Sequence, residues 1–144
     1  MFYQDYLKKI KTCPFCKAKK RMFIDNESAY LTYSKAPYHP HHLLVIPKRH
    51  VVSFFNLSAQ EDKDIAALVK VGAQILKKLK YDSFSILVRE GPDSDKSIKH
   101  LHYHLIPNIR IGDVDAHGVP RKILTASEIK SLSAKIISLA SKIK

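Results

Sequence analysis

The sequence has no tryptophan, only two cysteines and only four glycines in 144 residues. It lacks any apolar run of the roughly 18 residues that a membrane-spanning helix needs. Its charged first residues lack the apolar centre of a secretory signal peptide. Two cysteines three positions apart are also too few for the disulfide framework of a secreted protein. We therefore expect a cytoplasmic protein that has no membrane partner.

Acidic residues are scarce relative to basic ones: 13 Asp and Glu stand against 25 Lys and Arg, a net charge of +12 with neutral histidines. Such a charge attracts anions, and both nucleotides and nucleic acids qualify. The basic residues are spread along the chain and are poorly interleaved with aromatic residues, so a solvated surface explains most of the excess. Nucleic acid is thus a possible partner but not the favoured one.

The length suits a single domain, and 45% apolar residues suffice for a core. Two capping boxes, at 58–61 and 125–128, each precede apolar residues at helical spacing. These patterns predict an α+β fold with a largely antiparallel sheet. We expect strands at 21–24, 29–33, 42–46, 83–88 and 99–106, and helices before residue 13, after 58 and after 125. The domain core is expected at about 13–108, with a C-terminal helical extension at about 125–143.

The run His100-Leu101-His102-Tyr103-His104 is the most informative segment. Side chains alternate faces along a strand, so the three imidazoles are expected on one face. Such a row is costly in an ordinary core, because each ring has polar nitrogens that need partners. A solvent-facing edge strand and a fortuitous metal clamp remain open. The functional interpretation is that a neutral imidazole acts as a nucleophile without a second base.

Polar residues just before this run suit a phosphate group. Arg89, Lys96 and Ser97 supply charged or hydroxyl donors, and the loop at 89–96 is polar throughout its length apart from Gly91 and Pro92. Donors placed where negative charge develops stabilise phosphoryl transition states. The residues themselves therefore favour chemistry on a phosphate, with a histidine as nucleophile.

Three segments together resemble one known family. The histidine run followed by Leu105-Ile106 matches the His-φ-His-φ-His-φ-φ signature (φ apolar) of the histidine triad, or HIT, superfamily. The segment 42–50, HLLVIPKRH, is similar to the family's His-x-Leu-Val-Ile-Pro-Lys-x-His strand. The segment 13–16, CPFC, resembles the Cys-x-x-Cys of many members. The resemblance covers residues 13 to about 107.

The resemblance implies a HIT-like fold with a five-stranded antiparallel sheet and two main helices, and a two-fold homodimer. It also implies release of nucleoside monophosphate, AMP first of all, from dinucleoside polyphosphates, phosphoramidates or adenylylated compounds. By position, His102 matches the nucleophile that forms a nucleotidyl-histidine intermediate, with its other ring nitrogen donating to the carbonyl of His100. The remaining matches are His104 at the phosphate, Ser97 near the leaving group, His42 beside the row and Phe15 at the base.

The chain departs from the family pattern at several positions. Ser34 stands where relatives have an acidic or amide residue for the ribose hydroxyls, and Arg89 where many have Asn. Lys96 replaces a commonly neutral residue near the phosphate, which suggests a preference for longer polyphosphate chains. His41 takes a position that is commonly Gly, and with His39 it is best interpreted as loop polarity.

The cysteine pair raises a separate question of metal binding. Cys13 and Cys16 alone fit a redox pair or two core cysteines as well as a metal site. The zinc-bearing members of the family complete a tetrahedral set with the histidines that match His50 and His100 here. The resemblance thus implies structural Zn²⁺, which would not be the catalyst because four protein ligands leave no open position.

Three functions compete. The first is a HIT nucleotide hydrolase; the second is a nucleic-acid-associated nucleotide-binding protein; the third is a zinc-stapled interaction module without activity. The intact His102 argues against the third, and the lack of a recognisable DNA-binding motif argues against the second. A nucleotidyltransferase or phosphorylase is a further alternative, although that branch commonly has Gln in place of His104. We expect the hydrolase.

Overall fold

The computed structural model describes residues 1–16, 22–94, 96–108 and 122–143. The chain divides into two compact units, Met1–Ile111 and Gly112–Lys144. All residues assigned to a site from the sequence fall in the first unit. Among the described residues, none of the helices is long and apolar enough to cross a membrane.

The first unit is built on a five-stranded sheet with the order β1-β2-β3-β5-β4. The strands are β1 (Ile24–Asp25), β2 (Ala29–Tyr33), β3 (Leu43–Pro47), β4 (Phe84–Val88) and β5 (Tyr103–Pro107). Every neighbouring pair is antiparallel. The predicted α+β class and the five-stranded antiparallel sheet are confirmed. Strand β3 lies at the centre and is buried along its whole length, as its run of apolar residues predicts.

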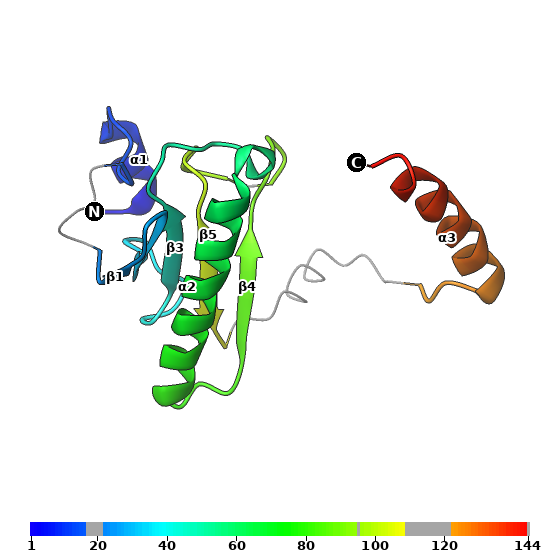
Figure 1. Ribbon diagram of the computed structural model, residues 1–144. Helices are drawn as coiled ribbons and strands as arrows, with labels where there is room; N and C mark the ends of the chain where they lie inside the picture. Colours follow the sequence, from blue (N-terminus) through cyan, green and yellow to red (C-terminus); the bar gives the residue numbers. More distant parts are fainter. Residues whose placement is uncertain (17–21, 95, 109–121, 144) are drawn as a thin grey trace. The chain divides into compact units, whose positions relative to one another are not determined.

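Helix α2 (Ala59–Lys78) covers one face of this sheet (Figure 1). Its N-terminus carries the predicted capping box, in which the Ser58 side chain accepts from the Glu61 amide and Glu61 accepts from the Ser58 amide. The helix lies close to the sheet at Gly72, where an added Cβ would be 3.0 Å from a Leu105 side-chain carbon. The core beneath it joins the buried residues Ala29, Leu31, Leu43, Val45, Ile65, Leu68, Leu76 and Leu105.

A smaller core lies on residues that alternate with those of the first along β2 and β3, hence on the opposite face of the sheet. It contains Phe15, Tyr30, Leu44, Ile46 and Ile98. Helix α1 (Tyr3–Lys9) packs there through Leu7, although none of its residues is fully buried. The Tyr30 hydroxyl donates to the Phe15 carbonyl at 2.7 Å, which ties the cysteine segment to β2. This face carries the site described below.

The histidine strand is shorter than predicted. Strand β5 begins at Tyr103, so His100 and His102 precede it in non-strand backbone. The ladder between β3 and β5 stops at Val45–Tyr103. Two residues further along β3 is Pro47, which has no N–H to donate. The predicted strand at 21–24 is reduced to Ile24–Asp25, and its first residue lies outside the described residues.

The remaining elements are short or belong to the second unit. A 3₁₀ helix, η2 (Phe54–Asn56), begins after Ser53, whose side chain accepts from the Phe55 amide. Helix α3 (Ala126–Ala140) starts with the predicted capping box of Thr125 and Glu128. Its apolar side chains are largely exposed within the described chain: Ile129, Leu132, Ile136, Ile137 and Leu139.

Candidate active site and metal centre

A cavity of about 560 Å³ opens on the sheet face opposite α2. Its volume is in the range of cavities that hold small organic ligands. The lining includes all but one of the residues that the sequence assigned to nucleotide binding or catalysis: Phe15, Ser34, His42, Arg89, Ser97, His102 and His104. Chain segments far apart in sequence therefore converge on one site.

His102 is fixed in one tautomer by a backbone contact. Its Nδ1 lies 2.9 Å from the carbonyl oxygen of His100, and a carbonyl only accepts, so Nδ1 carries the proton and donates. This contact is the one that the resemblance implied. The other ring nitrogen, Nε2, then holds a lone pair in the cavity. Burial lowers the pKa of His102 to about 4, and the positive charge of Lys96 acts in the same direction. The ring is neutral at physiological pH.

His42 and His104 form a second, directional pair. The Tyr38 amide donates to His42 Nδ1 at 3.2 Å, so a neutral His42 carries its proton on Nε2. That nitrogen donates to His104 Nδ1 at 2.9 Å. His104 consequently carries its own proton on Nε2, which is buried and has no hydrogen-bond partner among the described residues. Strand alternation alone does not distinguish the three imidazoles of the run. In the structure, His102 offers an acceptor to the cavity, and His104 has an unsatisfied donor.

The environment keeps this pair neutral. Burial lowers the pKa of His104 to about 3 and the pKa of His42 to about 4. Neighbouring imidazoles and the nearby charge of Arg89 lower both further. A neutral imidazole with a buried, unsatisfied N–H is suited to a phosphate oxygen, which accepts that bond and brings negative charge toward Arg89.

The apolar side of the cavity is centred on Phe15. Its ring meets the His102 ring edge-on, with 5.1 Å between centroids, and the His100 ring at 5.8 Å. Such a surface suits a flat heteroaromatic ring. Ser34 is also in the lining, and its amide donates to the His42 carbonyl at 2.9 Å.

Lys96 is placed differently from the other predicted phosphate contacts. Its ammonium group donates to the Val52 carbonyl, and the described cavity lining does not include it. Burial lowers its pKa. Lys96 therefore acts on the histidines through its charge rather than from within the cavity.

Several lining residues were not found from the sequence. Phe2, Tyr3 and Tyr6 contribute from the region of helix α1, and Tyr38 stacks on His42 with 5.7 Å between ring centroids. The Tyr3 hydroxyl lies 2.6 Å from the Ser97 hydroxyl, across 94 positions of sequence. The available signal was the three-residue spacing of Tyr3 and Tyr6, which places both on one side of a helix.

A second cluster adjoins the cavity and consists of Cys13, Cys16, His50 and His100. One ligand atom from each residue lies within 4.8 Å of all the others. Cys16 Sγ is 3.1 Å from Nδ1 of His50 and 3.4 Å from Nδ1 of His100, close to the roughly 3.6 Å between sulfur and nitrogen ligands of a tetrahedral zinc ion. Two thiols and two imidazoles are a donor set typical of structural zinc, and the residues fit a metal ion.

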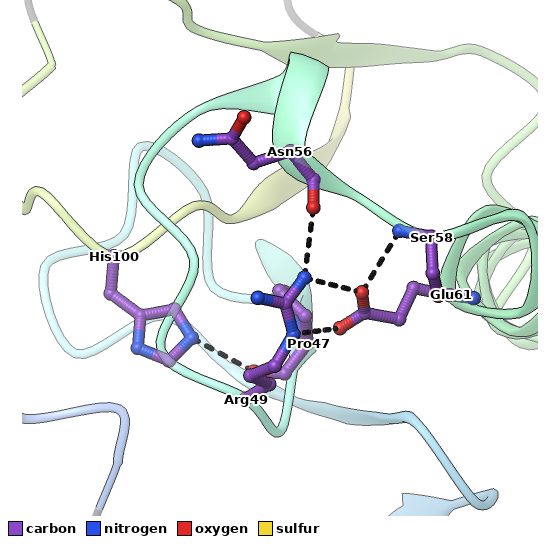
Figure 2. Close-up of polar contacts among 6 residues, drawn as sticks. All are labelled: Pro47, Arg49, Asn56, Ser58, Glu61 and His100. Atoms are coloured by element: carbon purple, nitrogen blue, oxygen red, sulfur yellow. Dashed lines mark hydrogen bonds and ion pairs between the residues drawn. The ribbon is translucent and has the colours of Figure 1, made fainter.

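The surroundings of His100, one member of this cluster, are shown in Figure 2. His100 Nε2 donates to the Pro47 carbonyl at 2.8 Å, which leaves the lone pair of Nδ1 directed at the sulfurs. Beside it, Arg49 donates to both carboxylate oxygens of Glu61, at 2.7 and 3.2 Å. These bonds tie the end of strand β3 to the start of helix α2.

His39 and His41 lie outside both clusters. The His41 amide donates to His39 Nδ1, and the two rings pack against Tyr81. His41 Nδ1 is also 3.1 Å from the Tyr33 hydroxyl. This environment agrees with the interpretation of these histidines as loop polarity.

The sequence is similar to those of known proteins. The family model of the HIT domain matches residues 16–110. Bis(5'-adenosyl)-triphosphatase of Saccharomyces cerevisiae is 28% identical over 97 residues, which is 66% of this chain and 47% of that protein. The chain thus spans about half the length of this relative. Adenosine 5'-monophosphoramidase of Schizosaccharomyces pombe is 31% identical over 103 residues, 72% of this chain and 75% of that protein.

Solved structures agree on the fold. A histidine triad nucleotide-binding protein from Candida albicans superimposes with a TM-score of 0.75 at 23% identity, covering 92% of this chain and all of that one. A HIT family protein from Bacillus anthracis gives a TM-score of 0.72 at 22% identity, covering 93% of this chain and 99% of that one. At these identities the likeness concerns the fold.

Proposed function

The chain belongs to the HIT domain family, and on that premise we propose that it is a nucleotide hydrolase. It releases a nucleoside monophosphate, most readily AMP, from a dinucleoside polyphosphate, a phosphoramidate or an adenylylated compound. The observation that carries this proposal is the tautomer of His102, whose Nδ1–H is held by the His100 carbonyl while Nε2 faces the cavity as a neutral nucleophile.

Two names among the relatives support the substrate class: one is a bis(5'-adenosyl)-triphosphatase and the other an adenosine 5'-monophosphoramidase. Both names describe cleavage beside an adenosine phosphate. The cavity supports the same class, with an apolar surface at Phe15 and donors at His104, Arg89 and Ser97. The net charge of +12 raises the local concentration of such anions.

The proposed reaction has two displacements at the α-phosphorus. In the first, the Nε2 lone pair of His102 forms a P–N bond, and the leaving group departs with the electrons of the broken P–O or P–N bond. A polyphosphate leaves as the anion, whereas an amine takes one proton from solvent and leaves as the neutral molecule. In the second, water attacks phosphorus, the P–N bond breaks and its electrons return to Nε2, and water's proton is lost to solvent. His102 keeps its Nδ1 proton throughout, and its positive charge in the intermediate is stabilised by the His100 carbonyl.

His104, His42 and Ser97 support these steps in different ways. His104 donates from Nε2 to a phosphate oxygen, and His42 keeps that proton in place by donating to His104 Nδ1. Ser97 lies in the cavity beside the leaving group, with Ser34 at the sugar and Phe15 at the base.

We further propose that Cys13, Cys16, His50 and His100 bind structural Zn²⁺. A zinc ion held by four protein ligands supplies no catalysis there, only a link between the N-terminal segment and the start of the histidine run. Cysteines used as metal ligands rather than in a disulfide are typical of cytosolic proteins, which supports the proposed cytoplasmic location.

A homodimer is proposed as well. Strand β4 is an edge of the sheet, and its Phe84 and Ile86 side chains are 38% and 47% exposed. Beside them, a groove of about 570 Å³ runs along α2, with apolar lining that includes Val69 and Ala73. An edge strand of this kind pairs readily with a second copy of the same strand.

The test is the variant His102→Ala, assayed for AMP release from adenosine 5'-phosphoramidate. We expect activity to fall by at least about 10³-fold, because removal of a covalent nucleophile eliminates its route. Circular dichroism should be unchanged. His41→Ala is the matched control, since its imidazole is not part of the described cavity lining. Full activity in His102→Ala, or no acid-labile nucleotidyl-enzyme in the wild type after quenching, would contradict the mechanism.

A further inference from the structure

The wall of the cavity formed by helix α1 has no part in the proposed displacement steps. This wall, called the α1 wall here, consists of Phe2, Tyr3, Tyr6 and Lys35, all of which line the cavity. Phe2 is 84% exposed at its rim. Aromatic side chains left at a cavity, rather than buried in a core, indicate a binding surface.

The α1 wall is attached to the catalytic machinery at one defined atom. The Tyr3 hydroxyl is 2.6 Å from Ser97 Oγ, and Ser97 is the residue that the proposed function places beside the leaving group. Leu7 on the same helix packs against the smaller core. The wall is therefore held against the end of the cavity from which the leaving group departs.

The chemistry of the α1 wall is aromatic and cationic. The Tyr3 and Tyr6 rings lie nearly parallel, 20° apart with 6.2 Å between centroids. The Lys35 ammonium nitrogen is 5.2 Å from the centre of the Tyr6 ring. Aromatic side chains beside a lysine are the combination that proteins use to stack a nucleobase and to neutralise its phosphates. A small amine would use neither feature.

We propose that the α1 wall is a subsite for the leaving group and that it selects a second nucleoside joined through a phosphate chain. This inference rests on the proposed function. The first nucleoside occupies the Phe15 side of the cavity, its α-phosphate lies at His102 and His104, and the second base stacks on the tyrosines of α1. Dinucleoside polyphosphates are then favoured over phosphoramidates with small leaving groups.

The experiment compares two substrates that share AMP and differ in the leaving group: diadenosine triphosphate, which releases ADP, and adenosine 5'-phosphoramidate, which releases ammonia. In Tyr6→Ala, we expect the ratio of kcat/KM for the first substrate to kcat/KM for the second to fall about tenfold, within the range for loss of one base–aromatic stack. The change should lie in KM. Tyr6→Phe keeps the ring and should restore the ratio.

Two outcomes would overturn the inference. One is an unchanged ratio in Tyr6→Ala, and the other is an equal loss for both substrates, which would indicate only a structural role for the ring. Melting temperature is measured in parallel.

If wild-type protein releases AMP from neither substrate, the proposed function fails while the subsite is still testable. Calorimetry with a methylene-bridged diadenosine triphosphate and with AMP then decides: the subsite requires that Tyr6→Ala weaken the first ligand about tenfold more than the second. Equal weakening of both ligands, or none, would contradict it.

Discussion

Two clusters of imidazoles lie side by side and share a single five-residue run, yet they differ in what holds their rings. In the metal cluster, Nδ1 of His100 faces both cysteine sulfurs, and Nδ1 of His50 faces the sulfur of Cys16. In the catalytic group, His42 and His104 bond directly to each other, while His102 bonds to a backbone carbonyl. The ring nitrogens and sulfurs of the metal cluster can bind one ion, whereas the hydrogen bonds of the catalytic group determine which nitrogen of each ring carries the proton.

This difference shows how neighbouring residues of one type acquire separate roles. His100 belongs to both arrangements: its ring faces the sulfurs, and its backbone carbonyl holds the proton of His102. A metal bound at its ring would position the peptide that sets the tautomer of the nucleophile. Stability and catalysis are thus coupled through one residue but should be separable by variants that remove groups on either side of it.

Loss of a metal ligand should give the largest effect. We expect His50→Ala to lower the melting temperature by about 10 °C or more, since loss of a bound metal is among the few changes that cost over about 4 kcal/mol. The zinc content of the variant, measured by elemental mass spectrometry, should also fall. AMP release assayed at low temperature should be largely retained, because the His102–His100 contact uses the backbone.

His41→Ala is the matched control for that variant, because its imidazole lies outside the metal cluster. Wild-type protein that is purified without metal and is not destabilised by a chelator would count against the metal centre. An equal loss of stability in His41→Ala would show that the effect does not depend on metal binding.

The catalytic side is tested by removing the ring that fixes the His104 tautomer. In His42→Ala, Nδ1 of His104 loses its donor, and the proton can move to that nitrogen. We expect kcat to fall about tenfold, the equivalent of one hydrogen bond of roughly 1.4 kcal/mol, with zinc content unchanged. Because His42 is buried, its truncation also lowers stability, so kcat is measured well below the melting temperature of the variant. His39→Ala provides the control. An unchanged kcat in His42→Ala would show that His42 does not position the proton of His104.

Much of this fold was predictable because its signals are local. The capping box at Ser58 and the apolar periodicity after it depend only on nearby residues, and helix α2 begins where they indicate. The four-residue apolar run of β3 likewise predicts a central strand. The predicted start of β5 was wrong. The ladder between β3 and β5 stops at Val45–Tyr103, two residues before Pro47, which has no N–H to pair and lies more than 50 positions away in the sequence.

The residues of the site likewise fall into those that the sequence predicted and those that it did not. Motifs such as the histidine run and the cysteine pair point to residues that the fold then brings together. Phe2, Tyr3 and Tyr6 carry no such motif, and only tertiary packing shows that they line the cavity. Lys96 was expected at the phosphate because of its position before the run, but its ammonium group is directed to the Val52 carbonyl instead. The direction of a long side chain is set by neighbours that the sequence does not reveal.

The smallest expected effect is that of pH, which should change stability and catalysis over different ranges. In the folded protein the pKa of His42 is lowered to about 4 and that of His104 to about 3, both chiefly by burial, whereas an unfolded chain has imidazoles near 6.5. Below pH 6.5 the unfolded state therefore binds more protons, so stability should fall from that pH down to about 3, the lower of the two folded-state values, and be unaffected above pH 6.5.

Catalysis should depend less on pH than stability does just below pH 6.5, because the buried rings of the folded protein remain neutral there. An ordinary imidazole would be about nine-tenths protonated at pH 5.5, and kcat/KM would fall about tenfold. We expect kcat/KM for adenosine 5'-phosphoramidate to stay within about twofold at that pH, since kcat/KM reports the free enzyme. Zinc content is measured at each pH, so that loss of metal is not mistaken for titration. A midpoint near 6.5 with metal still bound would show that the cavity does not hold these histidines neutral, and the donor on His104 would then be a charged one.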